Sequence, residues 1–179
     1  MEDRYKLELR ERDPSTIQEL ILDNCKSETI KGIGNDLTSL KHLSMINVGL
    51  TSLDGLPLLP ELEILDLCEN QLDSGLDIVA KQCPKLQKLV LSTNRFSKME
   101  QLDPLKDLKD LNTMDTFQNE VENTEDFRQK LFELIPCLED LNGQDVNGEE
   151  GAESEGAPPT RRGTKRRHEE DSNDGDSKH

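Results

Sequence analysis

Histidine, cysteine and carboxylate side chains are the groups in this sequence that could perform chemistry. The histidines are His42, His168 and His179, and the cysteines are Cys25, Cys68, Cys83 and Cys137. The cysteines form no Cys-x-x-Cys pair and have no histidine at metal-ligand spacing. No nucleophile motif or phosphate-binding loop occurs, and Gly32-Ile33-Gly34 is too short to cradle a phosphate. We therefore predict no catalytic residue, no metal site and no cofactor, and a protein that is not an enzyme.

The carboxylates are numerous, and several of them recur at fixed positions relative to leucines. The frame Leu-x-x-Leu-x-Leu-x-x-Asn-x-Leu runs from Leu62 to Leu72 and, with Phe as its last residue, from Leu86 to Phe96. Further copies start at Ile17, Leu40 and Leu111, and a sixth fragment contains Leu138 and Leu141. Successive frames start 22 to 27 residues apart. This period is that of a leucine-rich repeat.

Each frame predicts a short strand followed by a turn. Its fourth and sixth residues alternate with outward positions and therefore point to one face of the strand. The asparagine at the ninth position can satisfy backbone groups that a tight turn leaves unpaired. One repeat cannot bury its apolar face alone, whereas stacked repeats can. We predict an α/β leucine-rich-repeat solenoid of about five repeats, with a parallel sheet on its concave side.

The third, fifth and seventh frame positions define the predicted concave face, because their side chains point away from the core. Five carboxylates and a single lysine, Lys88, occupy these positions together with several apolar residues. Apolar anchors among charges are typical of protein-binding surfaces. As an alternative, β-branched residues suit exposed strand positions without any binding role. The predicted partner-binding residues are Glu19, Asp23, Ile46, Ile64, Asp66, Asp115, Phe117 and Asp140.

Capping segments are predicted at both ends of the stack. Residues 1–13 are expected to form a helix that covers the first repeat, and Pro14 ends it. Asn123 is expected to cap a second helix, which Pro136 ends. The first predicted domain is therefore the capped repeat domain, residues 1–145.

The composition changes abruptly from about residue 146, since no Leu, Ile, Phe or Met follows. Such a segment buries too little apolar surface to offset its ordering entropy, and we predict a disordered tail over residues 146–179. The tail has a short acidic stretch and then a basic run typical of a nuclear-import signal; a solvated charge run without a role is the alternative. Ser154 and Ser172 lie among acidic residues and are candidate phosphorylation sites. The predicted import residues are Arg161, Arg162, Lys165, Arg166 and Arg167.

The charge balance limits the classes of partner. The 179 residues have a formal net charge of −16. Residues 1–143 contain 28 acidic against 16 basic residues, and residues 144–179 contain 10 against 6, so most of the negative charge belongs to the repeat domain. We expect no direct contact with nucleic acid through the folded domain, and a basic protein as the partner. Aromatic residues make up only 3% of the chain, which also argues against a base-stacking platform.

The sequence contains no signal peptide and no apolar run long enough to span a membrane. The four cysteines are expected to be free thiols in a reducing compartment. These features predict a soluble intracellular protein with no membrane contact.

Several segments of the sequence resemble the acidic leucine-rich nuclear phosphoprotein 32 family. They are residues 7–15 with 19–24, residues 43–53, residues 74–86 and residues 126–138. The resemblance covers roughly residues 1–145, and the chain is similar to a short-tailed or divergent member of that family. It implies a non-enzymatic nuclear protein with cytoplasmic shuttling, carried by an import receptor. Histone binding, chaperoning, and regulation of transcription and apoptosis are the implied roles.

Two other functions stay open beside histone binding: inhibition of protein phosphatase 2A, and a scaffold role in a spliceosomal ribonucleoprotein. The sequence also departs from the family in three ways. Only a short acidic remnant near residues 149–155 stands where the family usually has a long, nearly pure Asp/Glu tail. Thr116 stands where an apolar strand residue is expected, which should loosen the core locally. Asn142 and Gln144 replace the aspartate and the aromatic residue that are usual in the family's cap.

Overall fold

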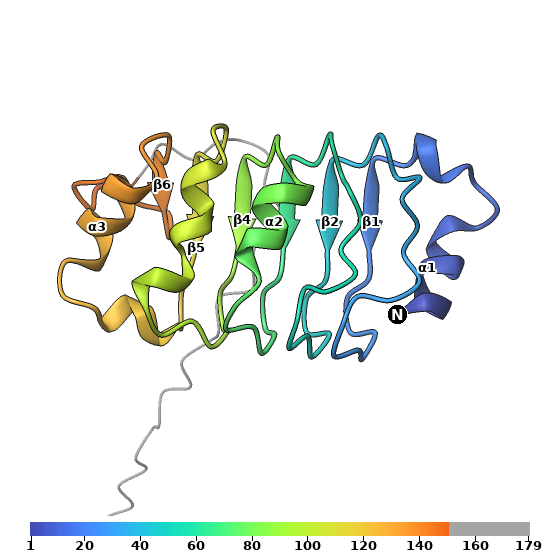
Figure 1. The fold of residues 1–179 in the computed structure, drawn as a ribbon, viewed down its shortest axis with the longest axis horizontal. Coiled ribbons are helices and arrows are strands. Elements are labelled where there is room, and N and C mark those ends of the chain that lie inside the picture. The colour runs from blue at the N-terminus through green and yellow to red at the C-terminus, as the bar shows by residue number, and fades with distance from the viewer. Residues whose placement is uncertain (151–179) are drawn as a thin grey trace, which may run out of the picture.

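The computed structural model of the protein describes residues 1–150. Within this range, six short strands form one parallel sheet in chain order, so each strand pairs with the strand of the next repeat (Figure 1). The strands are β1 (Glu19–Ile21), β2 (His42–Ser44), β3 (Ile64–Asp66), β4 (Lys88–Val90), β5 (Thr113–Asp115) and β6 (Asp140–Leu141). The predicted leucine-rich-repeat solenoid with a parallel sheet is therefore confirmed.

The core is a stack of equivalent apolar side chains, one layer from each repeat. The fourth frame residues pair in register along the whole sheet, from Leu20 in β1 to Leu141 in β6. The sixth frame residues, such as Leu67 and Leu91, are completely buried beside them. Full burial of one such side chain contributes about 1.5–3 kcal/mol. Because the layers repeat with the frame, the hydrophobic effect fixes the register of the strands.

Asparagine side chains at the ninth frame position connect neighbouring repeats. Asn70 is buried, and its Oδ1 accepts hydrogen bonds from the N–H groups of Val48, Gly49 and Leu50 at 3.0–3.2 Å. Its Nδ2 donates to the carbonyl oxygens of Met45, Leu67 and Cys68. Asn94 and Asn119 bind the repeats before them in the same manner. The predicted role of this asparagine in satisfying turn backbone is therefore confirmed.

The residue at the eighth frame position, just before the ninth, turns the chain through the left-handed region of backbone space. Its φ lies between 52° and 62° in all five frames. Each of these residues from the first to the fourth frame donates its backbone N–H to a carbonyl oxygen of the next repeat at 2.7–3.0 Å. The set is Asn24, Asn47, Glu69, Thr93 and Gln118. Asparagine tolerates this conformation, whereas a β-branched residue such as Thr93 rarely adopts it.

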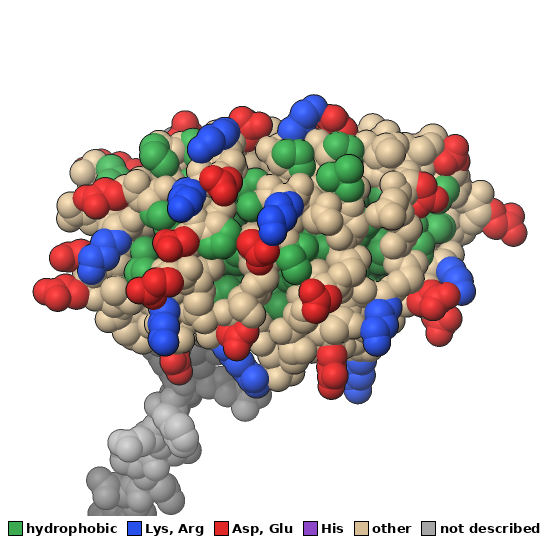
Figure 2. Space-filling model, viewed as in Figure 1, with side chains coloured by type: hydrophobic (Ala, Val, Ile, Leu, Met, Phe, Trp, Pro, Cys, Tyr) green, Lys and Arg blue, Asp and Glu red, His purple; other side chains and the backbone are tan. Residues whose placement is uncertain are grey.

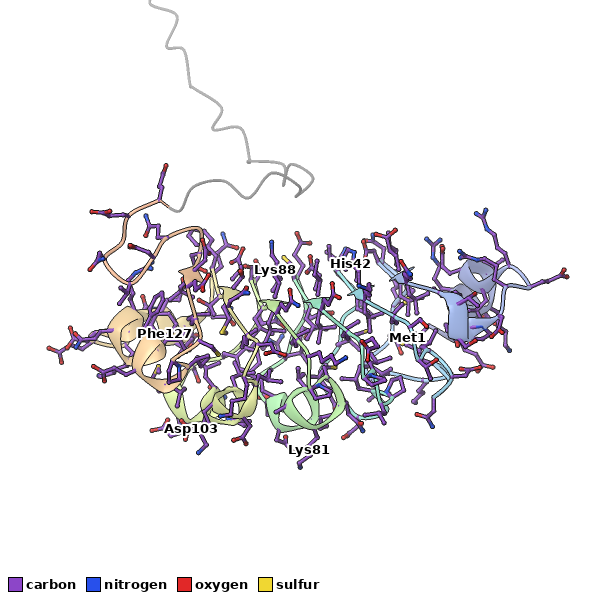
Figure 3. The ribbon with its side chains drawn as sticks, turned by 90° about the horizontal axis from the view of Figure 1, so that it is seen from above. Met1, His42, Lys81, Lys88, Asp103 and Phe127 are labelled. Atoms are coloured by element: carbon purple, nitrogen blue, oxygen red, sulfur yellow. The ribbon has the colours of Figure 1, made fainter. Side chains whose placement is uncertain are left out.

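Helical segments cover the convex side of the sheet. Between β3 and β4 lies α2 (Leu76–Gln82), which the sequence analysis did not predict, although the apolar residues Leu76, Val79 and Cys83 have helical spacing and are buried. The 3-10 helices are η1 (Pro14–Thr16), η2 (Met99–Gln101), η3 (Asp103–Asp107) and η4 (Glu120–Asn123). Figure 3 shows Lys81 of α2 and Asp103 of η3 on the side opposite to His42 and Lys88 of the strands.

The N-terminal cap is α1 (Glu2–Leu9), in which Tyr5 is buried while Met1 and Leu9 pack against the core. The prediction that this helix extends to residue 13 and is ended by Pro14 was wrong. The helix ends at Leu9, because Arg10 adopts a left-handed conformation directly after it.

The predicted cap of the second helix was wrong. Helix α3 (Phe127–Leu134) follows Asp126, whereas Asn123 is the last residue of η4. The reason is the buried side chain of Val121, whose backbone N–H donates to the carbonyl of Phe96 and holds Asn123 inside the preceding turn. The helix does end before Pro136, as predicted.

A polar junction joins the fifth repeat to the C-terminal cap. Thr116 is buried, and its hydroxyl donates to Oε1 of Glu122 at 2.8 Å. Asn142 donates its Nδ2 to the same oxygen at 2.6 Å and accepts from the backbone N–H of Thr116. An aspartate at position 142 would bring a second carboxylate against Glu122, which explains the amide here. The expected looseness of the core at Thr116 stays a prediction.

The C-terminal tail falls largely outside the described residues. The acidic pair at 153 and 155, the candidate phosphorylation sites Ser154 and Ser172, and the basic run at 161–167 all belong to residues 151–179, which the structure does not describe. The predicted disorder of this tail and the domain boundary near residue 145 therefore stay predictions.

Replacing Asn70 by alanine is expected to destabilise the protein by about 3 kcal/mol or more, because several buried backbone groups lose their partner at once. The free energy of unfolding from urea titration measures this. The matched control is Asn35→Ala, at an exposed asparagine, which should change the free energy by no more than about 0.5 kcal/mol. A loss of less than about 1 kcal/mol for Asn70→Ala would contradict the role given to this side chain.

Candidate protein-binding surface

Three rows of side chains cross the concave face, one for each outward position of the frame. The first row is Glu19, His42, Ile64, Lys88, Thr113 and Asp140, and the middle row is Ile21, Ser44, Asp66, Val90 and Asp115. The third row lies two residues further along each strand and comprises Asp23, Ile46, Cys68, Ser92 and Phe117. All eight side chains predicted from the sequence to bind a partner therefore lie on this one face.

No helix covers this face within residues 1–150. Figure 3 shows α2 and η3 beneath the sheet, while the side chains at His42 and Lys88 project from the other side. Phe117 is 59% exposed and Ile21 is 38% exposed, which is unusual for large apolar side chains on a sheet. The sheet therefore presents an uncovered surface with apolar and acidic side chains on it.

The convex face differs in its charge pattern. Figure 2 shows the molecule in the view of Figure 1, with α2 toward the viewer, and acidic and basic side chains are interspersed over this surface. On the concave face, the carboxylates of Glu19, Asp23, Asp66, Asp115 and Asp140 outnumber the single ammonium group of Lys88. The two faces are thus electrostatically distinct, and the concave face is the one suited to a cationic partner.

Two of the carboxylates bridge neighbouring strands. Oδ1 of Asp23 accepts hydrogen bonds from the hydroxyl of Ser44 at 2.6 Å and from the backbone N–H of Ile46 at 3.0 Å. Asp115 accepts in the same way from the hydroxyl of Ser92 and from the N–H of Phe117. These bonds orient both carboxylates, and Oδ2 of each accepts no hydrogen bond from residues 1–150.

The serines that hold these carboxylates were not predicted from the sequence. Ser44 and Ser92 occupy outward positions but are buried, because the bridging aspartates cover their hydroxyl groups. A small hydroxyl residue at an outward position, beside an aspartate at an outward position of the adjacent frame, is the signal that could have identified them.

Asp66 lies at the centre of the face. Its Oδ1 accepts a hydrogen bond from the backbone N–H of Cys68 at 2.9 Å. Burial raises the pKa of Asp66 above its ordinary value, and the carboxylates of Asp23 and Asp115 raise it further, while the Cys68 N–H and His42 act in the opposite direction. The negative charge of Asp66 therefore repels those of Asp23 and Asp115, although each of these lies two strands away.

Cys68, beside Asp66, is not a reactive thiol. Burial, together with the negative charges of Asp66, Glu69 and Asp115, raises the pKa of the Cys68 thiol to about 11. The thiol stays protonated at neutral pH and is a poor nucleophile. Residues 1–150 also contain no cluster of His, Cys, Asp and Glu that could hold a metal ion. In the same range, no helix is long and apolar enough to cross a membrane.

Comparison with known proteins places this chain among leucine-rich-repeat proteins. A sequence model described as leucine-rich repeat matches residues 8–169. Acidic leucine-rich nuclear phosphoprotein 32 family member A of Drosophila pseudoobscura pseudoobscura is 43% identical over 156 residues, which is 87% of this chain. Acidic leucine-rich nuclear phosphoprotein 32-related protein 2 of Caenorhabditis elegans is 41% identical over 183 residues and aligns with 99% of this chain and 76% of its own length.

The chain spans only 59% of the length of the Drosophila pseudoobscura relative and 57% of the corresponding Drosophila melanogaster protein. Among solved structures, the Drosophila melanogaster SNF/U2A′ complex contains a similar chain, with a TM-score of 0.64 and 27% sequence identity. The match covers 72% of this chain and 74% of that one.

Replacing Asp66 by asparagine is expected to maintain or raise stability at pH 7, by up to about 1 kcal/mol. Asparagine keeps the acceptor for the Cys68 N–H but removes the repelled charge. Because the folded-state pKa is raised above 3.8, Asp66 lowers stability as the pH rises through that raised value. The gain in stability of Asp66→Asn should therefore appear at pH values above the raised pKa of Asp66 and vanish at lower pH.

Urea titrations at a series of pH values between about 3 and 7 measure this difference. Asp103→Asn, at an exposed carboxylate of the convex side, is the matched control and should change stability by no more than about 0.5 kcal/mol at any of these pH values. An Asp66→Asn variant that loses stability at pH 7 and regains it in acid would show that the carboxylate is favourably paired instead.

Proposed function

Because the chain belongs to the acidic leucine-rich nuclear phosphoprotein 32 family, we propose that it is a non-enzymatic nuclear protein that binds basic proteins, histones among them, on its concave face. The family relationship favours a nuclear protein. The choice of a basic partner rests on the charges of the sheet itself.

The observation that carries this proposal is the distribution of charge over the three rows. Lys88, the basic residue of the first row, forms no ion pair within residues 1–150, whereas Glu19 of that row lies 3.1 Å from the His42 ring. The middle and third rows have carboxylates at Asp23, Asp66 and Asp115 and no lysine or arginine. A cationic segment that lies along these two rows meets only attractive charges, which gives both rate and specificity of association.

Apolar contacts are expected to add affinity beside the charges. Phe117 lies two residues after Asp115 in the chain and donates its backbone N–H to that carboxylate, and its ring is exposed at the third row. An exposed aromatic ring next to an oriented carboxylate suits a partner in which an aliphatic or aromatic residue alternates with lysine or arginine.

A scaffold role in a ribonucleoprotein is the second candidate. It is favoured by the similarity in fold to a chain of the SNF/U2A′ complex, at 27% identity. A partner that stays bound at high salt would support this candidate, because contacts through exposed charges weaken as salt screens them. Inhibition of protein phosphatase 2A stays a proposal that rests on family resemblance alone, as do chaperoning and the regulation of apoptosis.

Transport between nucleus and cytoplasm is proposed to depend on the tail. The run of Arg161, Arg162, Lys165, Arg166 and Arg167 would engage an import receptor, and Ser154 and Ser172 would be sites of phosphorylation. Each of these proposals rests on the sequence of the tail.

Replacing both Asp66 and Asp115 by asparagine is expected to weaken binding of core histones about tenfold or more at low salt, because two attractive charges are lost. Asparagine retains the oxygen acceptors used by Cys68, Ser92 and Phe117, so the fold is maintained. Replacing both residues by lysine (Asp66→Lys with Asp115→Lys) should abolish histone pull-down at moderate salt, because two repulsive charges then take the place of the attractive ones. Isothermal titration and pull-down measure these effects.

The matched control changes two exposed carboxylates of the convex side, Asp103→Asn with Asp107→Asn. Both double variants have the same net charge, so a non-specific attraction would weaken equally in the two. Equal affinity of the concave variant and the unmodified protein would refute the concave-face proposal.

Deleting residues 161–167 from a fluorescent fusion is expected to shift the protein from the nucleus to the cytoplasm. The ratio of nuclear to cytoplasmic fluorescence in live cells measures this shift. As a control, Glu169, Glu170 and Asp171 are replaced by their amides, which leaves the basic run intact. A deletion that leaves the ratio unchanged would remove the import proposal.

A further inference from the structure

The middle and third rows of the concave face present regularly spaced negative charge that no described residue neutralises. Asp66 and Asp115 occupy the same row two strands apart, so about 10 Å separates their positions. Val90 lies between them in the row and contributes no charge. A ligand that follows this row across the strands therefore needs cations about 10 Å apart.

The chain itself contains a segment with this spacing. Arg162 and Lys165 are three residues apart, which spans about 10 Å in an extended chain. Arg161, Arg166 and Arg167 add three further cations on either side of this pair. The basic run thus complements the carboxylates of the middle row in both sign and spacing.

The segment starts close enough to reach the row. The described chain ends at Glu150, which pairs with Gln144 in a short antiparallel bridge directly after β6. Figure 3 shows this last described segment on the strand side of the molecule, away from Lys81 and Asp103. Ten residues lie between Glu150 and Arg161, and the eleven Cα–Cα steps give a reach of at most about 40 Å. The six strands together extend over about 24 Å.

We propose that residues 161–167 dock on the concave face of their own chain, across the middle and third rows, with Arg162 and Lys165 against the carboxylates of Asp66 and Asp115. This inference rests on the same acidic surface as the proposed function. The docked run competes with basic partners for that surface. While it is docked, the run is also withheld from an import receptor, so binding of a basic partner releases the import signal.

The proposed contact between the basic run and the concave face is reversible. Exposed ion pairs are individually weak and are screened by salt. The connection of only ten residues, however, holds the basic run at an effective concentration of about a millimolar near the face. The repulsion among Asp23, Asp66 and Asp115, which adds to burial in raising the pKa of Asp66, is relieved when a cation lies between them. A partner with several cations and an apolar anchor displaces the run.

The test uses the full chain in which Arg161, Arg162, Lys165, Arg166 and Arg167 are all replaced by glutamine. Amide proton–nitrogen spectra at low ionic strength are compared with those of the unmodified protein. The amide resonances of Asp66, Cys68, Asp115 and Phe117 should move, whereas those of Lys81 and Asp103 on the convex side should not. Addition of about 0.5 M salt to the unmodified protein should produce the same shifts.

A second readout is competition, with poly-L-lysine as the probe. At low salt the glutamine variant should bind this probe about two- to tenfold more tightly than the unmodified chain. The control for net charge replaces, by glutamine, five exposed basic residues that lie outside the three rows. This control variant should bind the probe within about twofold of the unmodified chain. These residues are Lys81, Lys98, Lys106, Lys109 and Lys130.

Identical spectra of the glutamine variant and the unmodified chain at low salt would overturn the proposal, even if basic proteins still bind the concave face. Shifts that grow with protein concentration would overturn it too, because the run would then dock on a second copy. Shifts independent of concentration support it, and they do so even if histones fail to bind, so the two proposals fail separately.

Discussion

The asparagine carboxamides at positions 70, 94 and 119 are the interaction on which the rest of this structure depends. Each binds the backbone of its own turn and of the repeat before it. Turns packed inside a parallel stack are shielded from water, so their N–H and C=O groups need partners within the protein. One amide provides both a donor and an acceptor at the same point, which a hydroxyl or a carboxylate of equal size cannot do as completely. These contacts join the turns of successive repeats, while the backbone hydrogen bonds of the sheet set the spacing of the strands and hence of the surface rows.

Three carboxylates of the concave face combine a structural role with an exposed negative charge. One oxygen of Asp23, Asp66 or Asp115 accepts backbone or serine hydrogen bonds where the strand ends, and this fixes the orientation of the carboxylate. The other oxygen is then presented at the sheet surface in a defined direction. A rigid acidic group loses less conformational entropy when a partner binds than a flexible glutamate does. Aspartate, with its short side chain, is therefore well suited to these positions.

Features of the structure that repeat with the frame could be predicted from the sequence, whereas features that depend on a single contact could not. The strands and the three outward rows were predictable, because alternation and the 22–27-residue period determine which side chains face the core. Helix α2 was not identified, since a seven-residue helix between two frames interrupts no leucine of the repeat. The position of Asn123 depended on burial of Val121, and the bonds of Ser44 and Ser92 depended on contacts between strands from different repeats. Local sequence patterns do not reveal contacts between residues of different repeats.

The asparagine contacts are not distributed evenly along the chain. The first two frames have Cys25 and Val48 at the ninth position, so the first turn lacks a carboxamide from the second repeat. Its link to the second repeat consists of backbone hydrogen bonds, such as that from Ser27 to Val48, of apolar contacts, and of side-chain bonds nearer the surface, such as those from Ser44 to Asp23 and from Asn47 to Asn24. In a solenoid, stability is close to a sum of repeat and nearest-neighbour terms, so a weaker interface divides the array into units that open separately. We therefore expect the N-terminal helix and the first repeat to form a foldon of lower stability, so that Asp23 belongs to the part of the acidic surface that opens while the remainder stays folded.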